Sequence, residues 1–155
     1  MKTYDINAVE EQLKTQDSAA YLTSGVSMRP LLRTHKDIVV ISKAKHPLSV
    51  GDVPLYKKKG VEKLILHRII GIKEDGTYII RGDNTYHKEY IPQSDVVGVM
   101  TALYRGGKYI DCNNSKPYEI YVRLNKFFYP ARWLWYVRVR PFLSKISKKC
   151  KYFAH

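Results

Sequence analysis

Three side chains that together could hydrolyse a peptide bond occur in the order Ser27, His67 and Asp83. A serine hydroxyl becomes a strong nucleophile when an imidazole takes its proton, and a carboxylate can hold that imidazole in the base-competent tautomer. Gly25 and Pro30 flank Ser27 and predict a tight, sterically open turn. In such a turn the backbone N–H of Ser27 could also bind an oxyanion. The three residues therefore predict a serine hydrolase site.

The sequence around His67 predicts a strand that positions the base. Alternation along residues 63–70 places Lys63, His67 and Ile69 on one face, which is largely apolar. Partial desolvation there favours the neutral imidazole near pH 7. Taken one at a time, the residues also fit ordinary structural roles: Ser27 could be a turn serine, His67 could be bonded to the backbone, and Asp83 could belong to an ordinary Gly-Asp-Asn turn.

The segments that carry these residues resemble the signal peptidase I type of serine protease, in its histidine-using branch. Residues 24–30 (Ser-Gly-Val-Ser-Met-Arg-Pro) look like its nucleophile box, and residues 66–70 (Leu-His-Arg-Ile-Ile) look like its general-base box. Residues 81–84 (Arg-Gly-Asp-Asn), followed by 95–99, look like the last boxes of its catalytic fold. The similarity covers roughly residues 20–104, and three motifs in the expected order are more specific than any one of them.

The resemblance implies a Ser–His mechanism in which Ser27 is the nucleophile, His67 the base and Asp83 the orienting acid. It implies an extended peptide or protein substrate, such as a signal or leader peptide, with no cofactor and no metal. Some relatives have a hydroxyl two residues before the nucleophile, where this chain has Gly25, and Glu89 is the nearest candidate for a second acid. The residues expected to form or support the oxyanion hole are Ser24, Gly25, Met28 and Arg68.

Two other functions fit parts of the same sequence. The distantly related SOS-repressor type of self-cleaving peptidase uses a Ser–Lys dyad, and Lys63 lies on the predicted face of His67. A lysine base must be buried beside apolar groups to lose its proton, whereas residues 57–59 and Lys63 form a charge run typical of a solvated face. The second alternative is a non-catalytic module that binds lipid or DNA.

The pattern of apolar and turn residues predicts a mostly β (α+β) fold, a compact mixed or antiparallel β-domain of the signal-peptidase type. A helix over residues 5–20 and a helical C-terminal tail flank the strands. The domain organisation predicted is a catalytic domain over 1–117 and a basic, aromatic tail over 118–155. Strands are predicted at 37–41, 53–56, 63–72, 77–80, 96–104 and 108–110.

The predicted tail differs from the rest of the chain in charge and aromatic content. Residues 118–155 contain nine Lys or Arg against Glu119 alone, and 11 of the 19 aromatic residues; the whole chain has a net charge of +13. Aromatic and basic side chains favour an anionic membrane interface, so we expect peripheral attachment and no nucleic acid partner. Pro130 and Pro141 should divide the tail into three helical pieces. The residues expected at the interface are Trp133, Trp135, Arg138 and Arg140.

Neither the ends of the chain nor its cysteines indicate another class of protein. Residues 1–20 lack the charged-then-apolar pattern of a signal segment, and no run approaches the ~18 apolar residues of a spanning helix. Cys112 and Cys150 lack the paired spacing of a zinc or redox motif, so reduced thiols are expected.

Overall fold

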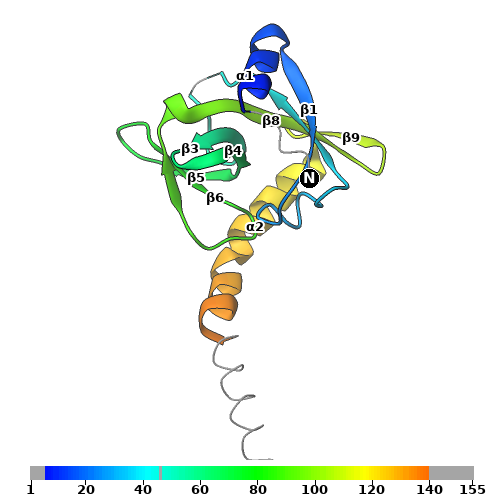
Figure 1. Ribbon diagram of the computed structural model, residues 1–155. Coiled ribbons are helices and arrows are strands. Elements are labelled where there is room, and N and C mark those ends of the chain that lie inside the picture. Colours follow the sequence, from blue (N-terminus) through cyan, green and yellow to red (C-terminus); the bar gives the residue numbers. More distant parts are fainter. Residues whose placement is uncertain (1–5, 46, 140–155) are drawn as a thin grey trace, which may run out of the picture. The chain divides into compact units, whose positions relative to one another are not determined.

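The computed structural model describes residues 6–45 and 47–139 (Figure 1). The first elements are α1 (Ile6–Thr15), β1 (Ser18–Leu22), β2 (Ile38–Ser42), β3 (Pro54–Lys58), β4 (Val61–Leu66), β5 (Arg68–Ile72) and β6 (Tyr78–Arg81). They are followed by β7 (Glu89–Ile91), the 3₁₀ turn η1 (Gln93–Asp95), β8 (Val96–Arg105), β9 (Lys108–Asp111), α2 (Lys116–Leu134) and the π-helical turn η2 (Trp135–Val139). This is the predicted mostly antiparallel α+β fold, with a helix at each end of the strands.

The strands form two antiparallel sheets organised around β8. The larger sheet has the order β1-β2-β8-β3-β4, and β9 also pairs with β8. The ten residues of β8 allow this, because its first half pairs with β3 and its second half with β9, while β2 lies along its other side. Figure 1 shows β8 as a long curved ribbon, around which the larger sheet curls into a half-barrel. The second sheet has the order β5-β6-β7.

Apolar side chains from both sheets share one core, which determines where the two sheets meet. Tyr56 of β3 is fully buried and belongs to the same cluster as Ile69 of β5 and Ile80 of β6. Removing such large side chains from water is the main force that holds two sheets together. The chain crosses from the larger sheet to the smaller at His67, between β4 and β5, so His67 lies next to this shared core.

Two predicted element boundaries are wrong, and both errors have a packing reason. The predicted helix over 5–20 ends at Thr15, because Ser18–Leu22 pairs with β2 and alternates exposed and buried residues. The predicted strand over 63–72 is two strands in different sheets, interrupted at His67. Strand alternation therefore does not extend from Lys63 to His67: Lys63 is exposed and His67 is buried. The three residues of β7 were not predicted.

The chain divides into two compact units, Met1–Tyr118 and Glu119–His155. In the second unit α2 continues through Pro130, which does not divide the described helix as predicted. A proline removes one backbone hydrogen bond, and here the flanking turns continue on either side of it. None of the described residues of α2 is buried. The pairs Glu119–Arg123 and Tyr121–Asn125 join successive turns of the helix.

Candidate functional site

Ser27 lies in a loop, residues 23–37, whose two ends are bound to each other. The backbone N–H of Thr23 donates to the carbonyl oxygen of Asp37 at 3.1 Å, and the N–H of His35 donates to that of Thr23 at 2.9 Å. The hydroxyl of Thr23 adds a bond to the Asp37 carbonyl at 3.0 Å. The Ser27 loop is therefore closed at its base by bonds that do not involve Ser27.

The side chain of Asp37 strengthens this closure. It is completely buried and accepts bonds from the guanidinium of Arg33 at 2.8 and 3.0 Å and from that of Arg105 at 3.0 Å. Burial alone would raise the pKa of Asp37, but the hydrogen bonds from Arg33 and the Arg105 charge outweigh it and lower the pKa. The loop is thus held by a carboxylate that stays ionised.

The Ser27 loop is fastened to the turn that follows β6. The backbone N–H of Asn84 donates to the carbonyl oxygen of Ser27 at 2.7 Å, and its side-chain amide donates to that of Val26 at 3.2 Å. Gly82 fits between them and His67. A Cβ atom on Gly82 would lie 2.7 Å from the Ser27 carbonyl oxygen and 3.1 Å from Cδ2 of His67. Three segments far apart in sequence therefore meet at Gly82.

The orientation of the His67 ring follows from these contacts. Its Cδ2 edge faces Gly82, whereas Nδ1 lies 3.1 Å from the Tyr56 hydroxyl and 3.5 Å from a carboxylate oxygen of Glu89. Because Nε2 is bonded to Cδ2, Nε2 lies on the ring edge that faces Gly82, and the backbone carbonyl of Ser27 also lies close to Gly82. Within the described residues the Ser27 hydroxyl has no hydrogen-bond partner; catalytic hydrogen bonds are often long until substrate binds.

The electrostatic surroundings of His67 favour its neutral form. Burial lowers the pKa of His67 below its usual 6.5; the negative charges of Glu89 and Asp83 oppose this and the positive charge of Lys58 adds to it. Lys58 forms an ion pair with Glu89 at 2.9 Å, so the carboxylate beside the imidazole is itself paired. The result is an imidazole available as a base near neutral pH, with an anion at its far nitrogen.

Asp83 occupies a different position from the one predicted for it. Its carboxylate forms a two-pronged ion pair with Arg68, with distances of 2.8 and 2.7 Å, and both side chains are buried. The position at Nδ1 that the sequence assigned to Asp83 is taken by Tyr56 and Glu89. Sequence reasoning noted Glu89 only as a second acid, and nothing in the sequence indicated that the Tyr56 hydroxyl would reach the imidazole.

The Arg68–Asp83 pair still acts on the site through the backbone. Arg68 directly follows His67, and Asp83 lies between Gly82 and Asn84, which touch Ser27. Burial opposes the charge of Arg68, but the Asp83 carboxylate outweighs it and raises the pKa of the guanidinium. Arg68 also donates to the carbonyl oxygen of Gly51 at 2.7 Å. The pair therefore sets the spacing between the histidine and the Ser27 loop.

The other predicted support residues fall into two groups. Ser24 is exposed, and Gly25 has a φ of +82° with no atom near the position of a Cβ, so this side of the loop is open to an approaching chain. Met28 is buried and anchors the loop in the core. The rival base Lys63 is exposed, so it lacks the burial that a neutral lysine requires.

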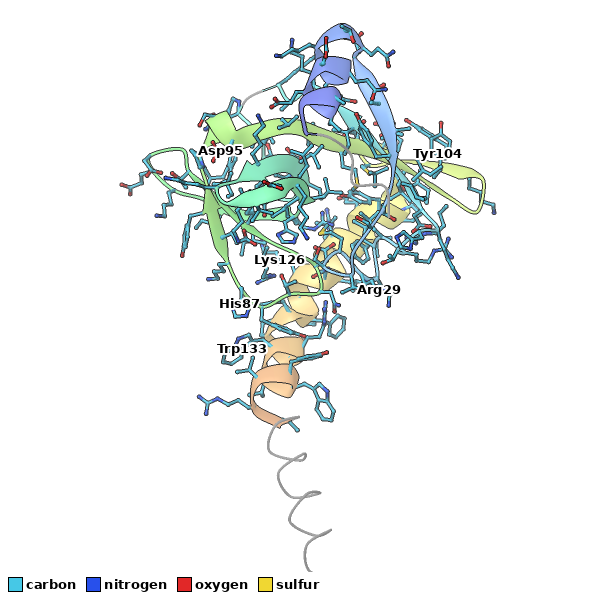
Figure 2. All side chains as sticks on the ribbon, in the orientation of Figure 1. Arg29, His87, Asp95, Tyr104, Lys126 and Trp133 are labelled. Carbon is cyan, nitrogen blue, oxygen red and sulfur yellow. The ribbon has the colours of Figure 1, made fainter. Side chains whose placement is uncertain are left out.

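The described part of the tail exposes large apolar side chains. Of the residues predicted at a membrane interface, Trp135 is 53% exposed, Trp133 is 38% exposed and Arg138 is exposed, while Arg140 lies outside the described residues. Figure 2 labels Trp133, whose side chain projects from α2. No helix in the described ranges is long and apolar enough to cross a bilayer.

On an antiparallel β scaffold, the described residues thus bring together a loop serine, a buried neutral histidine and a carboxylate at the far side of that histidine. That is the set of groups from which serine hydrolases are built. Comparisons with models of protein families, with curated proteins and with solved structures found no match to this chain.

Proposed function

We propose that this chain is a serine endopeptidase of the signal peptidase I type, which cleaves a signal or leader peptide. The observation that carries the proposal is that the Ser27 backbone and the Cδ2 edge of His67 both lie against Gly82, while Glu89 lies at Nδ1. Ser27 and His67 are distant in the sequence, yet both lie against Gly82, although the third residue of the motifs, Asp83, pairs with Arg68 instead. A serine and a histidine with merely structural roles would not require this proximity.

The mechanism uses only groups of this chain and water. The Ser27 oxygen attacks the scissile carbonyl carbon while Nε2 of His67 takes the hydroxyl proton, and the imidazolium then gives that proton to the leaving amine. Water next attacks the acyl-enzyme ester, with His67 again as base, and releases the carboxylic acid and Ser27. The Glu89 carboxylate stabilises the imidazolium formed in each half. An extended peptide would approach across the open side of Gly25.

The test is cleavage of a peptide library by the wild-type chain and by Ser27→Ala and His67→Ala. Each variant should lose roughly three orders of magnitude or more in kcat. Ser94→Ala is the matched control, because Ser94 is exposed on η1 and should cleave like the wild type. Unchanged cleavage by Ser27→Ala would refute the nucleophile assignment. Activity that survives in His67→Ala but not in Lys63→Ala would replace the proposal by a Ser–Lys peptidase.

We also propose that the chain attaches peripherally to an anionic membrane surface through α2 and η2. Large apolar side chains recur along the helix, at Ile120, Leu124, Phe127, Leu134 and Trp135, and all are about half exposed or more. Arg123 and Lys126 are exposed beside them, which suits the negative potential of an anionic leaflet. An interfacial helix buries one apolar side and leaves its cations at the headgroups.

Co-sedimentation with vesicles tests this second proposal. Binding to phosphatidylglycerol vesicles should exceed binding to phosphatidylcholine vesicles and weaken at high salt. Arg123→Gln and Lys126→Gln should each weaken binding about fivefold, because each basic residue near such a surface contributes roughly 1 kcal/mol to the binding free energy. Lys108→Gln, on β9, serves as a control that changes the same charge on another element. No binding to anionic vesicles at low salt excludes the proposal.

A further inference from the structure

We infer that Tyr56 is a positioning residue, whose hydroxyl lies between His67 and Glu89 and selects the imidazole tautomer that is protonated on Nδ1. The inference rests on the proposed function for its consequence in catalysis, but not for its geometry. Three distances carry it: the Tyr56 oxygen lies 3.1 Å from Nδ1 of His67 and 3.3 Å from Oε2 of Glu89, while Nδ1 lies 3.5 Å from Oε1 of Glu89.

The number of protons available leaves two arrangements of these bonds. The phenol has one hydrogen, so Tyr56 can donate either to Glu89 or to Nδ1, not to both at once. If the phenol donates to Glu89, its oxygen accepts a hydrogen bond from a protonated Nδ1, and Nε2 is unprotonated. If the phenol donates to Nδ1, that nitrogen must be unprotonated, and Nε2 carries the proton. Only the first arrangement leaves Nε2 able to take a proton from Ser27.

Glu89 decides between the two arrangements. A carboxylate accepts hydrogen bonds but has none to donate, and bonds to a charged acceptor are roughly twice as strong as neutral ones. Lys58 is paired with the same oxygen of Glu89, at 2.9 Å. The Tyr56 hydroxyl therefore donates to Glu89, and the sequence of bonds runs from Nδ1–H to the phenol oxygen and from the phenol O–H to the carboxylate.

Burial prevents Tyr56 from adopting another position. Its side chain is completely buried and belongs to the core cluster that joins the two sheets. Burial, together with Glu89, also raises the pKa of Tyr56, so the phenol keeps its proton throughout the working range of His67. The direct contact from Nδ1 to Glu89, at 3.5 Å, is at the outer limit of a hydrogen bond. The phenol is thus the nearer acceptor for Nδ1–H.

The experiment measures the His67 tautomer directly, by ¹⁵N NMR of the imidazole nitrogens at a pH where the ring is neutral. The wild-type chain should show Nδ1 protonated and Nε2 unprotonated. Tyr56→Phe should lower the ratio of Nδ1–H to Nε2–H about tenfold, because Nδ1–H loses its nearer acceptor. Glu89→Gln should move the ratio in the same direction with Tyr56 intact, because the phenol is released to donate to Nδ1.

Tyr78→Phe is the matched control for the loss of a buried phenol. Tyr78 is also fully buried in the core cluster, and its hydroxyl accepts a bond from the backbone N–H of Leu48 at 2.8 Å. Removing this hydroxyl should lower the free energy of unfolding about as much as Tyr56→Phe does, and it should leave the His67 tautomer unchanged. A tautomer ratio that stays at the wild-type value in both Tyr56→Phe and Glu89→Gln overturns the inference.

Kinetics then separate this inference from the proposed function. In the active peptidase Tyr56→Phe should lower kcat about tenfold with little change in KM, since the phenol touches the base and not the substrate. If Ser27→Ala cleaves like the wild type while the tautomer shifts as expected, the peptidase proposal fails and the role of Tyr56 stands. If Tyr56→Phe shifts the tautomer but lowers kcat no more than Tyr78→Phe does, the catalytic consequence is wrong.

Discussion

The residues around His67 and the residues of α2 use charge in opposite ways. Around His67 the ionised side chains are paired: Arg68 and Asp83 are buried and 2.7 Å apart, and the exposed Lys58 lies 2.9 Å from the partly buried Glu89. On α2 most of the cations are exposed, none of the described residues is buried, and large apolar side chains such as Phe127 face solvent. The first region pairs its charges, and the second exposes large apolar side chains.

This contrast indicates two kinds of function. Burying a charge costs several kcal/mol unless a partner offsets it, so paired buried charges persist where they fix geometry. Exposing large apolar side chains along a helix gains nothing in water, so such a surface persists where something covers it. In the proposed function, the first region would position reacting groups, and the second would bind a surface. Substitutions that leave one region intact should therefore leave the property of the other unchanged.

Among substitutions of charged residues, the largest effect on stability should come from breaking the Arg68–Asp83 pair. Asp83→Asn leaves the Arg68 charge buried without its anion, which should lower the free energy of unfolding by about 3 kcal/mol, measured by urea denaturation. Activity should fall as well, because Asp83 lies in the turn that holds Ser27. Vesicle binding by the folded fraction should not change.

A double variant separates stability from positioning. Arg68→Met with Asp83→Leu replaces the ion pair by apolar groups of similar size, which often restores the stability lost on breaking such a pair. It should recover much of the stability but little of the activity, since the spacing between His67 and the Ser27 loop is no longer set by a bidentate bond. Full recovery of activity would show that Arg68 and Asp83 matter only for folding.

Gly82→Ala should damage activity more than stability. The added methyl would lie 2.7 Å from the Ser27 carbonyl oxygen, a backbone atom that can move only with its loop. A displacement of about 1 Å can cost roughly a hundredfold in rate, so kcat should fall by about that factor. Gly71→Ala, which meets Ile79 at an ordinary 3.4 Å, is the control. Equal kcat in the two variants would mean that Gly82 does not set the distance between Ser27 and His67.

The sequence predicted the elements of the fold better than it predicted which side chains meet in it. Ser27 and His67 belong to local motifs, and alternation and turn residues reveal most strands, so both are visible along the chain. Which acid meets the imidazole depends on how two sheets pack. Because the chain changes sheets at His67, Glu89 on β7 and Tyr56 on β3 reach Nδ1, while Asp83 pairs with Arg68. No feature of the local sequence indicates such contacts between side chains of distant strands.

The pH profile of activity should show the electrostatics of His67. Its pKa is lowered from 6.5 by burial, so kcat/KM should rise with pH through a midpoint below 6.5 and fall about tenfold per unit below it. The charged groups that act on it are Glu89 on β7, Asp83 after β6 and Lys58 on β3. Glu89→Gln removes an anion and should lower the midpoint; Lys58→Gln removes a cation and should raise it. Shifts of the same sign in both variants would contradict this account.

The smallest effect on stability should come from the exposed apolar side of α2, and this makes it the sharpest test of the contrast. Leu124 is 49% exposed, and Leu124→Gln keeps a good helix former, so the free energy of unfolding should change by less than about 0.5 kcal/mol. Ile80→Ala, in the core cluster, should cost about 2–5 kcal/mol in the same measurement. Because Leu124 would enter the interface, its variant should nevertheless bind phosphatidylglycerol vesicles more weakly. A variant that loses stability as Ile80→Ala does would show that this side of α2 is covered by the chain itself, and the surface would then not be available to a membrane.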